Sequence, residues 1–471
     1  MPNISKKIIA CVLFSALLVS CSPTKAPESS VTHDLTEERS ADKTEQVSSD
    51  AGGNPYGPTE IYELDALNDD FLDQSFKLPY YNGKTHDQLY DLFINSANSF
   101  RGVSASINAI LPDTVVFGRG NFAYDKQTGN ISRTCKDPQC LHYHYDIPGA
   151  PRACSFITGV WMICKDRIFS NRVSINNHIL TTTVFTTDFS FNDLHYANLP
   201  NSDTVEGVCS DGRLILLKQQ HLPYIDKDGI QRYKGDDFEL YLYDTESKEE
   251  DLVFAPGEVF NVLTCGNIVY CNTYTNDGLY ALNEDREIRY IGKVKKILAM
   301  FDSKICYINE ESGDVLCCDV QTGETDTWVD KDSPLTNITW SGKFGDRLYF
   351  FRTHTIDEIR ALGFIDEAQL RTIMSESRTY SDGTFYAPII YSCNTNGSDI
   401  KIVYYTPYYT ITGFALDGEV LYTSGYGADK RDRFAAFDMS SGIELRINIP
   451  YSEYHYPGEY GYDENWRRGF N

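Results

Sequence analysis

The stretch "DSKICYINEESGDVLCCDVQTGET", residues 302–325, contains both of the patterns that predict the fold of this chain. It opens with a tight turn and an apolar run, "DSKICY", and later has an apolar run that stops at Asp319 and turns through "VQTG". Turn residues between short apolar runs are typical of antiparallel hairpins. An aspartate at a strand end can accept hydrogen bonds from the following turn. We therefore expect a four-stranded meander, in which the first turn joins strands A and B and the second joins C and D.

Both patterns recur seven times along the chain, in strict alternation. The third position of the first pattern falls at Thr114, Arg167, Arg213, Asn267, Lys304, Arg347 and Glu419. The acidic or amide position of the second pattern falls at Asp125, Asn198, Asp244, Asn283, Asp319, Asn394 and Asp438. A single sheet of this size cannot bury both faces, so a ring of sheets has to form the core.

The repeats predict an all-β protein, a seven-bladed β-propeller of four-stranded antiparallel blades. Six or eight blades are the alternatives, because residues 101–112 and the chain after Pro450 could add or complete a sheet. A pair of β-sandwiches would not explain two patterns that alternate in step.

The N-terminal residues predict export. Lys6 and Lys7 precede an apolar run, Ile8–Val19, which has the form of a signal peptide and is too short to span a bilayer as a mature helix. The run ends in "LVSC", which resembles the lipobox of bacterial lipoproteins. That resemblance implies that Cys21 receives a diacylglycerol and becomes the mature N-terminus, and two acyl chains anchor stably. We expect a lipoprotein on the cell membrane whose folded part faces outside the cytoplasm.

Composition divides the chain into five expected parts. Residues 22 onward are rich in Ser, Thr, Glu and Pro and cannot offset their ordering entropy, whereas "HDQLYDLFINSANSF" has apolar residues at helical spacing. The expected parts are a signal peptide at 1–20, a disordered tether at 21–57, an N-terminal segment with one short helix at 58–105, the propeller at 106–450 and a Tyr-rich tail packed on the propeller at 451–471.

Insertions are expected on one rim only. In a propeller the D-to-A connectors and the B-to-C loops lie on one rim, and the A-to-B and C-to-D turns lie on the other. Residues 219–237 separate strands B and C of blade 3, and residues 353–387 do so in blade 6, where the apolar spacing indicates a short helical pair. Elaborated loops on a rigid scaffold usually carry function.

A cysteine- and histidine-rich segment follows blade 1. Cys135, Cys140, His142 and Cys154 could supply a closed tetrahedral set for one structural zinc, and His144 is a competing ligand. A disulfide, Cys135–Cys140 or Cys140–Cys154, is the alternative in an oxidising compartment. Inert thiols are the third possibility.

Several other cysteines are expected in the core. Cys318 and Cys393 occupy the same strand position in neighbouring blades. Five more lie in or beside strands A and B: Cys164, Cys209, Cys265, Cys271 and Cys306. Buried thiols behave as small hydrophobes.

These features together resemble a family. The turns "YDKQTGN" and "CDVQTGE", the Asp-Gly hairpins, the lipobox and the cysteine-rich segment resemble bacterial lipoproteins with a TolB-like or lipoprotein-receptor-like β-propeller domain. The resemblance covers roughly residues 107–450. It implies the propeller fold and leaves the ligand open.

Charge and motifs narrow the function. The formal net charge of −25 repels phosphate backbones, so we expect no nucleic-acid partner. The sequence contains no nucleophile elbow, no His-Glu-x-x-His and no phosphate-cradling loop, so no catalytic residue is named. We expect a surface-tethered binding or scaffold module whose elaborated rim takes an unknown glycan, peptide or protein ligand. One alternative is an extracellular polysaccharide-active hydrolase or lyase with a carboxylate pair in the central funnel. Another is a structural partner in an envelope complex, with an apolar patch on the rim.

Overall fold

The computed structural model describes one compact unit that starts at Thr44. Its described residues are 45–48, 54–65, 72, 74–80, 107–118, 122–136, 161–164, 167–176, 179–199, 204–208, 212–225, 231–254, 259–265, 268–273, 278–283, 287–376, 383–407, 410–426 and 432–449. Within these ranges, no helix combines the length and apolar character needed to cross a membrane.

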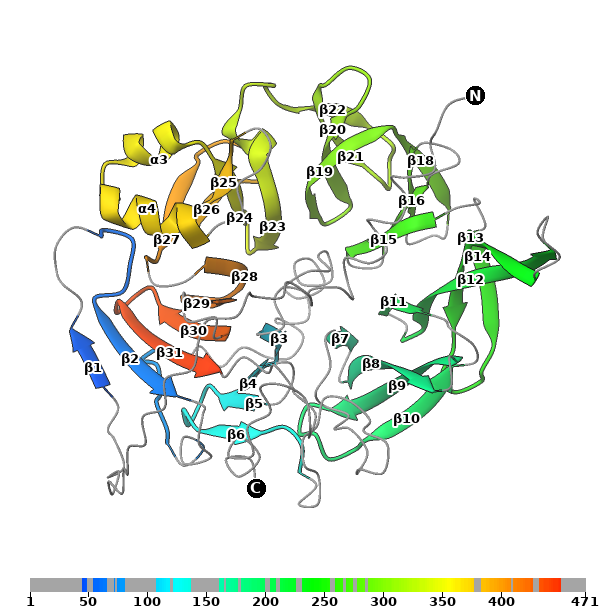
Figure 1. Ribbon diagram of the computed structural model, residues 1–471, viewed down its shortest axis with the longest axis horizontal. Helices are drawn as coiled ribbons and strands as arrows, with labels where there is room; N and C mark the ends of the chain where they lie inside the picture. The colour runs from blue at the N-terminus through cyan, green and yellow to red at the C-terminus, as the bar shows by residue number, and fades with distance from the viewer. Residues whose placement is uncertain are drawn as a thin grey trace, which may run out of the picture. The chain divides into compact units, whose positions relative to one another are not determined.

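Seven antiparallel sheets follow one another around a ring (Figure 1). Blade 1 consists of β3 (Ile107–Ile110), β4 (Thr114–Phe117), β5 (Phe122–Asp125) and β6 (Ile131–Arg133). Blade 2 consists of β7 (Trp161–Cys164), β8 (Arg167–Asn176), β9 (Ile179–Asp188) and β10 (His195–Leu199). Blade 3 consists of β11 (Thr204–Val208), β12 (Leu214–Ile225), β13 (Gln231–Tyr243) and β14 (Glu250–Phe254).

The remaining four blades repeat this meander. Blade 4 consists of β15 (Val259–Cys265), β16 (Ile268–Thr273), β17 (Gly278–Leu282) and β18 (Ile288–Gly292). Blade 5 consists of β19 (Val294–Phe301), β20 (Lys304–Asn309), β21 (Val315–Asp319) and β22 (Thr325–Val329). Blade 6 consists of β23 (Ile338–Phe344), β24 (Arg347–His354), β26 (Ile389–Asn394) and β27 (Lys401–Tyr405), and blade 7 of β28 (Thr410–Asp417), β29 (Val420–Tyr426), β30 (Asp432–Asp438) and β31 (Ile443–Ile449). The predicted all-β, seven-bladed propeller is confirmed.

The core lies between neighbouring blades. Phe169 and Val184 of blade 2 are buried against Leu214 and Leu216 of blade 3, and comparable clusters occupy the other blade interfaces. The A strands are in contact between blades 1 and 2, 2 and 3, 3 and 4, 5 and 6, and 6 and 7, and β28 contacts β3, so blade 7 meets blade 1. Each blade therefore buries both faces only because the ring supplies two neighbours.

The N-terminal segment bridges the junction between blades 7 and 1. Strand β2 (Glu60–Asp65) pairs in parallel with the outer edge of β31, and β1 (Glu45–Ser48) pairs antiparallel with β2 (Figure 1). Further along, the backbone N–H of Phe76 donates to the carbonyl of Gly129 in blade 1 at 2.9 Å, and the Tyr124 hydroxyl donates to the carbonyl of Phe76 at 2.9 Å. One chain segment thus holds the last blade and the first.

Because of this segment, the folded region starts earlier in the chain than residue 58, which follows the expected tether. Strand β1 and residues 54–57 fall inside the stretch expected to be a disordered tether. Strand β1 pairs with the open edge of β2, whereas the Tyr56 carbonyl accepts from the Tyr405 N–H of blade 6 and Asn54 Nδ2 donates to the Tyr405 carbonyl, both at 3.1 Å. The helix expected at 86–100, the signal peptide at 1–20 and the tail at 451–471 lie outside the described residues.

The turn patterns place the strands correctly, with one exception. Asn198 was expected to end strand C of blade 2, but it lies in strand D, β10, and Asp188 ends strand C instead. The prediction was wrong because Phe189 and Phe191 give the true turn the apolar look of a strand. Phe191 adopts the left-handed conformation there, with φ 63°, whereas Gly129 and Gly323 do so in the matching turns of blades 1 and 5.

Candidate functional site

The two rims of the ring differ in their loops. We call the rim formed by the A-to-B and C-to-D turns the tight rim, and the opposite one the elaborated rim. All A-to-B and C-to-D connections are short. By this connectivity, the elaborated rim carries the long hairpins β8–β9 and β12–β13 and the helices α3 (Ile356–Leu362) and α4 (Glu367–Glu376).

Both predicted insertions are present on that rim. In blade 3 the inserted residues extend strands B and C into one hairpin, with Leu222 opposite Lys234 and Ile225 opposite Gln231. In blade 6 the predicted helical pair is confirmed as α3 and α4, and a short strand, β25 (Phe385–Tyr386), returns the chain to β24.

On the tight rim, side chains at the ends of the C strands hold the turns closed. The Asp244 carboxylate accepts hydrogen bonds from the N–H groups of Glu246 and Ser247 at 2.7 and 3.0 Å. The N–H groups of Ser247 and Glu246 lower the pKa of Asp244. Asp125 and Asp319 accept equivalent bonds in their own turns. The second sequence pattern therefore encodes turn structure.

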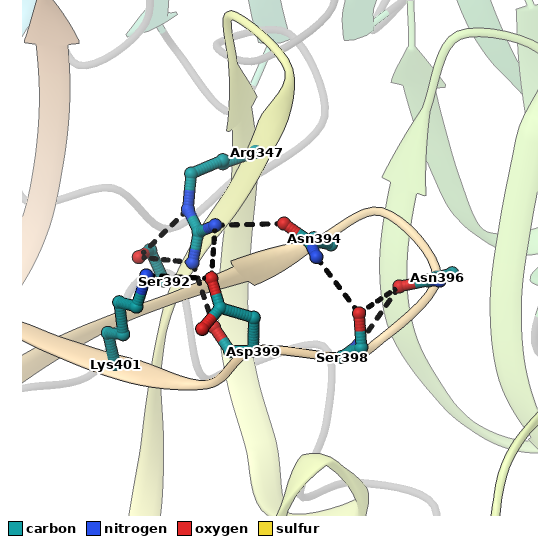
Figure 2. A network of polar contacts seen from close by, with 7 residues as sticks. All are labelled: Arg347, Ser392, Asn394, Asn396, Ser398, Asp399 and Lys401. Carbon is teal, nitrogen blue, oxygen red and sulfur yellow. Dashed lines mark hydrogen bonds and ion pairs between the residues drawn. The ribbon is translucent and has the colours of Figure 1, made fainter.

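Figure 2 shows the most extensive of these turns, in blade 6. The Arg347 guanidinium donates to Asn394 Oδ1 at 2.8 Å and to Asp399 Oδ2 at 3.0 Å. Lys401 also pairs with Asp399 at 2.8 Å, and Lys401 and then Arg347 lower the pKa of Asp399. Arg347 and Asn394 are the two pattern positions of this blade, so the patterns meet in space.

The same arginine position serves two other blades. Arg167 of blade 2 pairs with Asp193 at 2.8 Å, and Arg213 of blade 3 pairs with Asp251 at 3.3 Å. In each case strand B reaches across to the C-to-D turn or to the strand that follows it. The recurrence in three blades indicates a structural device rather than a ligand site.

At the other end of strand β24, the helical insertion begins with a strong helix start. The Thr355 hydroxyl accepts from the Glu358 N–H, and the Glu358 carboxylate accepts from the Thr355 N–H at 2.7 Å. This reciprocal capping box satisfies two of the free donors at the start of α3. Gly363 ends the helix in the left-handed conformation, with φ 77°.

Beneath this helix start lies a polar cluster of three buried residues, Arg352, His354 and Tyr391, together with the partly exposed Glu358. His354 Nε2 lies 2.8 Å from the Tyr391 hydroxyl, and the Arg352 guanidinium donates to Glu358 Oε1 at 2.8 Å. Arg352 also lies over the Tyr391 ring, 5.5 Å from its centroid. His354 is fully buried and Tyr391 is 5% exposed. Strands β24 and β26 and helix α3 are thus joined through side chains.

The two rings of the cluster, His354 and Tyr391, are uncharged near pH 7. Burial and then the positive charge of Arg352 lower the pKa of His354 to about 3, although Glu358 opposes this shift. Burial raises the pKa of Tyr391 to about 12. Both rings are therefore neutral near pH 7 and exchange no proton there. We interpret the cluster as the anchor of the insertion rather than as a general acid or base.

The anchored helices present a polar surface. Asp357, Arg360, Glu367 and Arg371 are exposed, and Arg360 Nε pairs with Glu367 Oε1 at 2.8 Å across the turn between α3 and α4. The inner face carries Ile359 and Leu370, which are buried in the cluster between blades 5 and 6. The insertion therefore offers an ordered surface of alternating charge.

The predicted metal and lipid residues fall mostly outside the described part of the chain. Cys135 follows β6 and packs, partly buried, beside the cluster between blades 1 and 2. Cys140, His142, Cys154 and the lipidation residue Cys21 lie outside the described residues, so zinc or a disulfide at this segment stays a prediction. Among the residues that the structure places, no group of three or more His, Cys, Asp or Glu side chains could hold a metal ion.

Sequence reasoning missed the buried anchor. A local signal was present, because Arg352 and His354 alternate on one strand face just before the Thr355–Glu358 capping box. Tyr391 gave no such signal, because it follows the long insertion and the sequence alone does not show which residue of β24 it pairs with. Five of the expected core thiols, Cys265, Cys271, Cys306, Cys318 and Cys393, are buried. Cys209 and the side chain of Cys164 lie outside what the structure describes.

Comparison with known proteins gives similarity in fold alone. No protein-family model matches the chain, and no curated protein sequence does. Similar solved structures include a puromycin hydrolase mutant, with 10% identity, a TM-score of 0.36 and coverage of 75% of this chain and 57% of that one. A structure from a study of two prolyl endopeptidases has 9% identity, a TM-score of 0.43 and coverage of 78% and 50%. The β-propeller domain of the Trilobed protease from Pyrococcus furiosus has 13% identity, a TM-score of 0.38 and coverage of 73% and 91%. The chain thus spans little more than half of the first structure and half of the second, and the fold assignment rests on the sheet topology above.

Proposed function

We propose that this protein is a membrane-tethered binding module whose elaborated rim recognises a ligand outside the cytoplasm. The observation that carries the proposal is the asymmetry of the rims. The long hairpins and the helical insertion share one rim, whereas the other rim is closed by short, hydrogen-bonded turns. A scaffold that concentrates its insertions on one side is typical of a recognition surface.

Electrostatics support a ligand that is not polyanionic. The formal net charge of −25 disfavours phosphate-rich partners. The exposed face of α3 and α4 carries both signs of charge, which suits the hydroxyl groups of a glycan or the backbone of a peptide.

Binding is preferred over glycoside chemistry on the behaviour of the described carboxyl groups. A glycosidase acid needs a raised pKa. Hydrogen bonds and neighbouring cations lower the pKa values of Asp244, Asp399 and Glu367. Burial raises the pKa values of Asp188 and Glu358, but their hydrogen bonds and cation partners outweigh it and lower both. These groups act as permanent acceptors for turns, helix starts and arginines.

The binding proposal is tested on glycan and peptide arrays with purified chain that lacks the lipid. Arg371→Glu reverses one charge on the exposed face of α4, and Glu324→Gln removes one on the tight rim as the matched control. We expect Arg371→Glu to weaken binding at least tenfold and Glu324→Gln to leave it unchanged, with the same circular dichroism spectrum for both. Equal binding by all three proteins, or loss only in Glu324→Gln, contradicts the proposal.

The tether is tested separately. Cys21→Ala removes the residue that the lipobox resemblance implies is acylated. We expect the protein to leave the membrane fraction for the medium, or to accumulate as unprocessed precursor. Normal processing together with unchanged membrane retention would show that no lipid at Cys21 anchors the chain.

A further inference from the structure

Two cysteines of blade 5 face each other across neighbouring strands. Cys306 of β20 is directly opposite Cys317 of β21 in the antiparallel register. Their sulfur atoms are 3.0 Å apart, with the Cys306 thiol as donor and Cys317 Sγ as acceptor. The adjacent Cys318 points to the other face of the sheet, because successive strand residues alternate, and it packs in the cluster between blades 4 and 5.

The backbone around this pair suits a covalent link. The N–H of Asn309 donates to the carbonyl of Asp314, and the N–H of Val320 donates to the carbonyl of Ser303. These bonds mark hydrogen-bonded pairs at each end of the ladder, and the type alternates along it. Cys306 and Cys317 therefore form a non-hydrogen-bonded pair, where opposing Cα atoms approach to about 4.5 Å. That distance lies in the range a disulfide bridges without backbone movement.

The two thiols are not equivalent. Cys306 is fully buried, whereas Cys317 is partly exposed. The hydrogen bond from Cys306, and then the charge of Lys304, lower the pKa of Cys317 against the effect of burial. Burial, and then the hydrogen bond to Cys317, raise the pKa of Cys306. Cys317 is thus the accessible nucleophile and Cys306 the protonated partner beside it.

We propose that Cys306 and Cys317 are a redox-active dithiol that forms a disulfide by exchange with an external disulfide oxidant. The Cys317 thiolate attacks one sulfur of the oxidant, forms a mixed disulfide and releases one thiolate. Cys306 then loses its proton and attacks Cys317 Sγ, which forms the Cys306–Cys317 bond and releases the second thiolate. The two cysteines are oxidised by two electrons, and the oxidant is reduced to two thiols.

The link would fix strands B and C of blade 5 to each other. Cys306 belongs to the same buried cluster as Ile359 and Leu370 of the helical insertion. The oxidised blade would therefore be more rigid at the wall on which the insertion packs.

The proposal is tested on the folded full chain with oxidised glutathione as the probe. The reduced protein is incubated with the probe, its free thiols are alkylated, and it is cleaved after glutamate. Cleavage at Glu310 or Glu311 separates the two cysteines, so a disulfide appears as a linked peptide pair. We expect loss of two alkylated thiols, a Cys306–Cys317 linked pair and full reversal by dithiothreitol.

Single variants assign the roles. Cys306→Ser should leave Cys317 as a mixed disulfide with glutathione, whereas Cys317→Ser should leave Cys306 unmodified. Cys265 and Cys271, which are buried in blade 4 opposite Ile268 and Val262, serve as internal controls and should stay reduced. Recovery of both Cys306 and Cys317 as alkylated thiols after oxidation, or a link from Cys317 to another cysteine, overturns the proposal without need of any variant.

Discussion

Strands β24 and β26 of blade 6 carry a polar cluster at each end, and the two clusters differ in burial and in partners. On the tight rim, Arg347 joins Asn394 and Asp399 in contact with water (Figure 2). On the elaborated rim, the buried Arg352 holds Glu358 and lies over the Tyr391 ring. The first cluster closes a turn that recurs around the ring. The second supports an insertion found in this blade alone among the described blades.

The difference in burial predicts how much a substitution at each rim should destabilise the fold. A water-exposed ion pair adds little to the free energy of unfolding, so its recurrence in several blades changes stability little. In a buried polar cluster, the loss of one partner leaves another buried group unpaired, and this destabilises the fold more than the loss of an exposed pair does. We therefore expect changes at the elaborated rim to cost more than matched changes at the tight rim.

The largest effect is expected from Ile359→Ala. Ile359 is the fully buried residue of α3, and its truncation leaves a cavity worth about 3 kcal/mol. Hydrogen exchange of the α3 and α4 amides should show this loss as faster local opening, while blades 1 to 3 keep their protection. Leu362→Ala, on the same helix but only partly buried, is the control and should cost clearly less. Equal losses in the two variants would contradict the packing described here.

Acidification should loosen the same insertion. Folded His354 stays neutral down to about pH 3, whereas the unfolded residue binds a proton below about pH 6.5. Its contribution is therefore complete above pH 6.5 and is lost as the pH falls toward 3, by about 2 kcal/mol at pH 5. The protection factors of the α3 amides, corrected for the intrinsic pH dependence of amide exchange, should fall accordingly, and His354→Asn should flatten this profile. His195 is the control, because it is exposed in blade 2. If His195→Asn flattens the pH profile equally, the pH dependence does not arise from His354.

A turn cap on the tight rim should matter less. Asp319→Ala removes the acceptor for the N–H groups of Gln321 and Thr322 and for the Ser303 hydroxyl. We expect a loss of about 1 kcal/mol in chemical denaturation. Asp326→Ala, at an exposed position on the next strand, should be close to neutral. A loss at Asp319 larger than that at Ile359 would reverse the ranking of the two rims.

The smallest effect is expected from Arg347→Gln. The Arg347 guanidinium is partly buried and pairs with the exposed carboxylate of Asp399. The loss should shrink further as salt rises from 0.05 to about 0.5 M, because exposed pairs are screened. Arg371→Gln, which is exposed on α4, provides the reference, and a large, salt-independent loss of stability at Arg347 would contradict the weak, screened ion pair described for the Arg347 cluster in Figure 2.

The fold could be read from the sequence because its signals are local. Asp125 and Gly129, or Asp319 and Gly323, lie four residues apart in the chain and in the same turn. The pattern failed at Asp188 because Phe189 and Phe191 give that turn the apolar look of a strand. Local chemistry of this kind also predicted the helical pair in blade 6.

The buried anchor and the dithiol could not be read in the same way. His354 meets Tyr391 across the whole insertion, and that contact depends on how β24 and β26 pair after a long excursion. Cys306 and Cys317 are closer in the chain, but only the register of β20 and β21 shows that their side chains share a face. The N-terminal strand β2 joins β31 from the far end of the sequence, which no periodic pattern encodes.

The central claim is that the elaborated rim binds and the tight rim closes the fold. It is tested most directly by hydrogen–deuterium exchange of the full chain, with and without the glycan or peptide that binds best on the array. The account predicts new protection in α3, α4 and the β12–β13 hairpin, and unchanged exchange in the turns that follow Asp244, Asp319 and Asn394. Protection confined to those turns would contradict it.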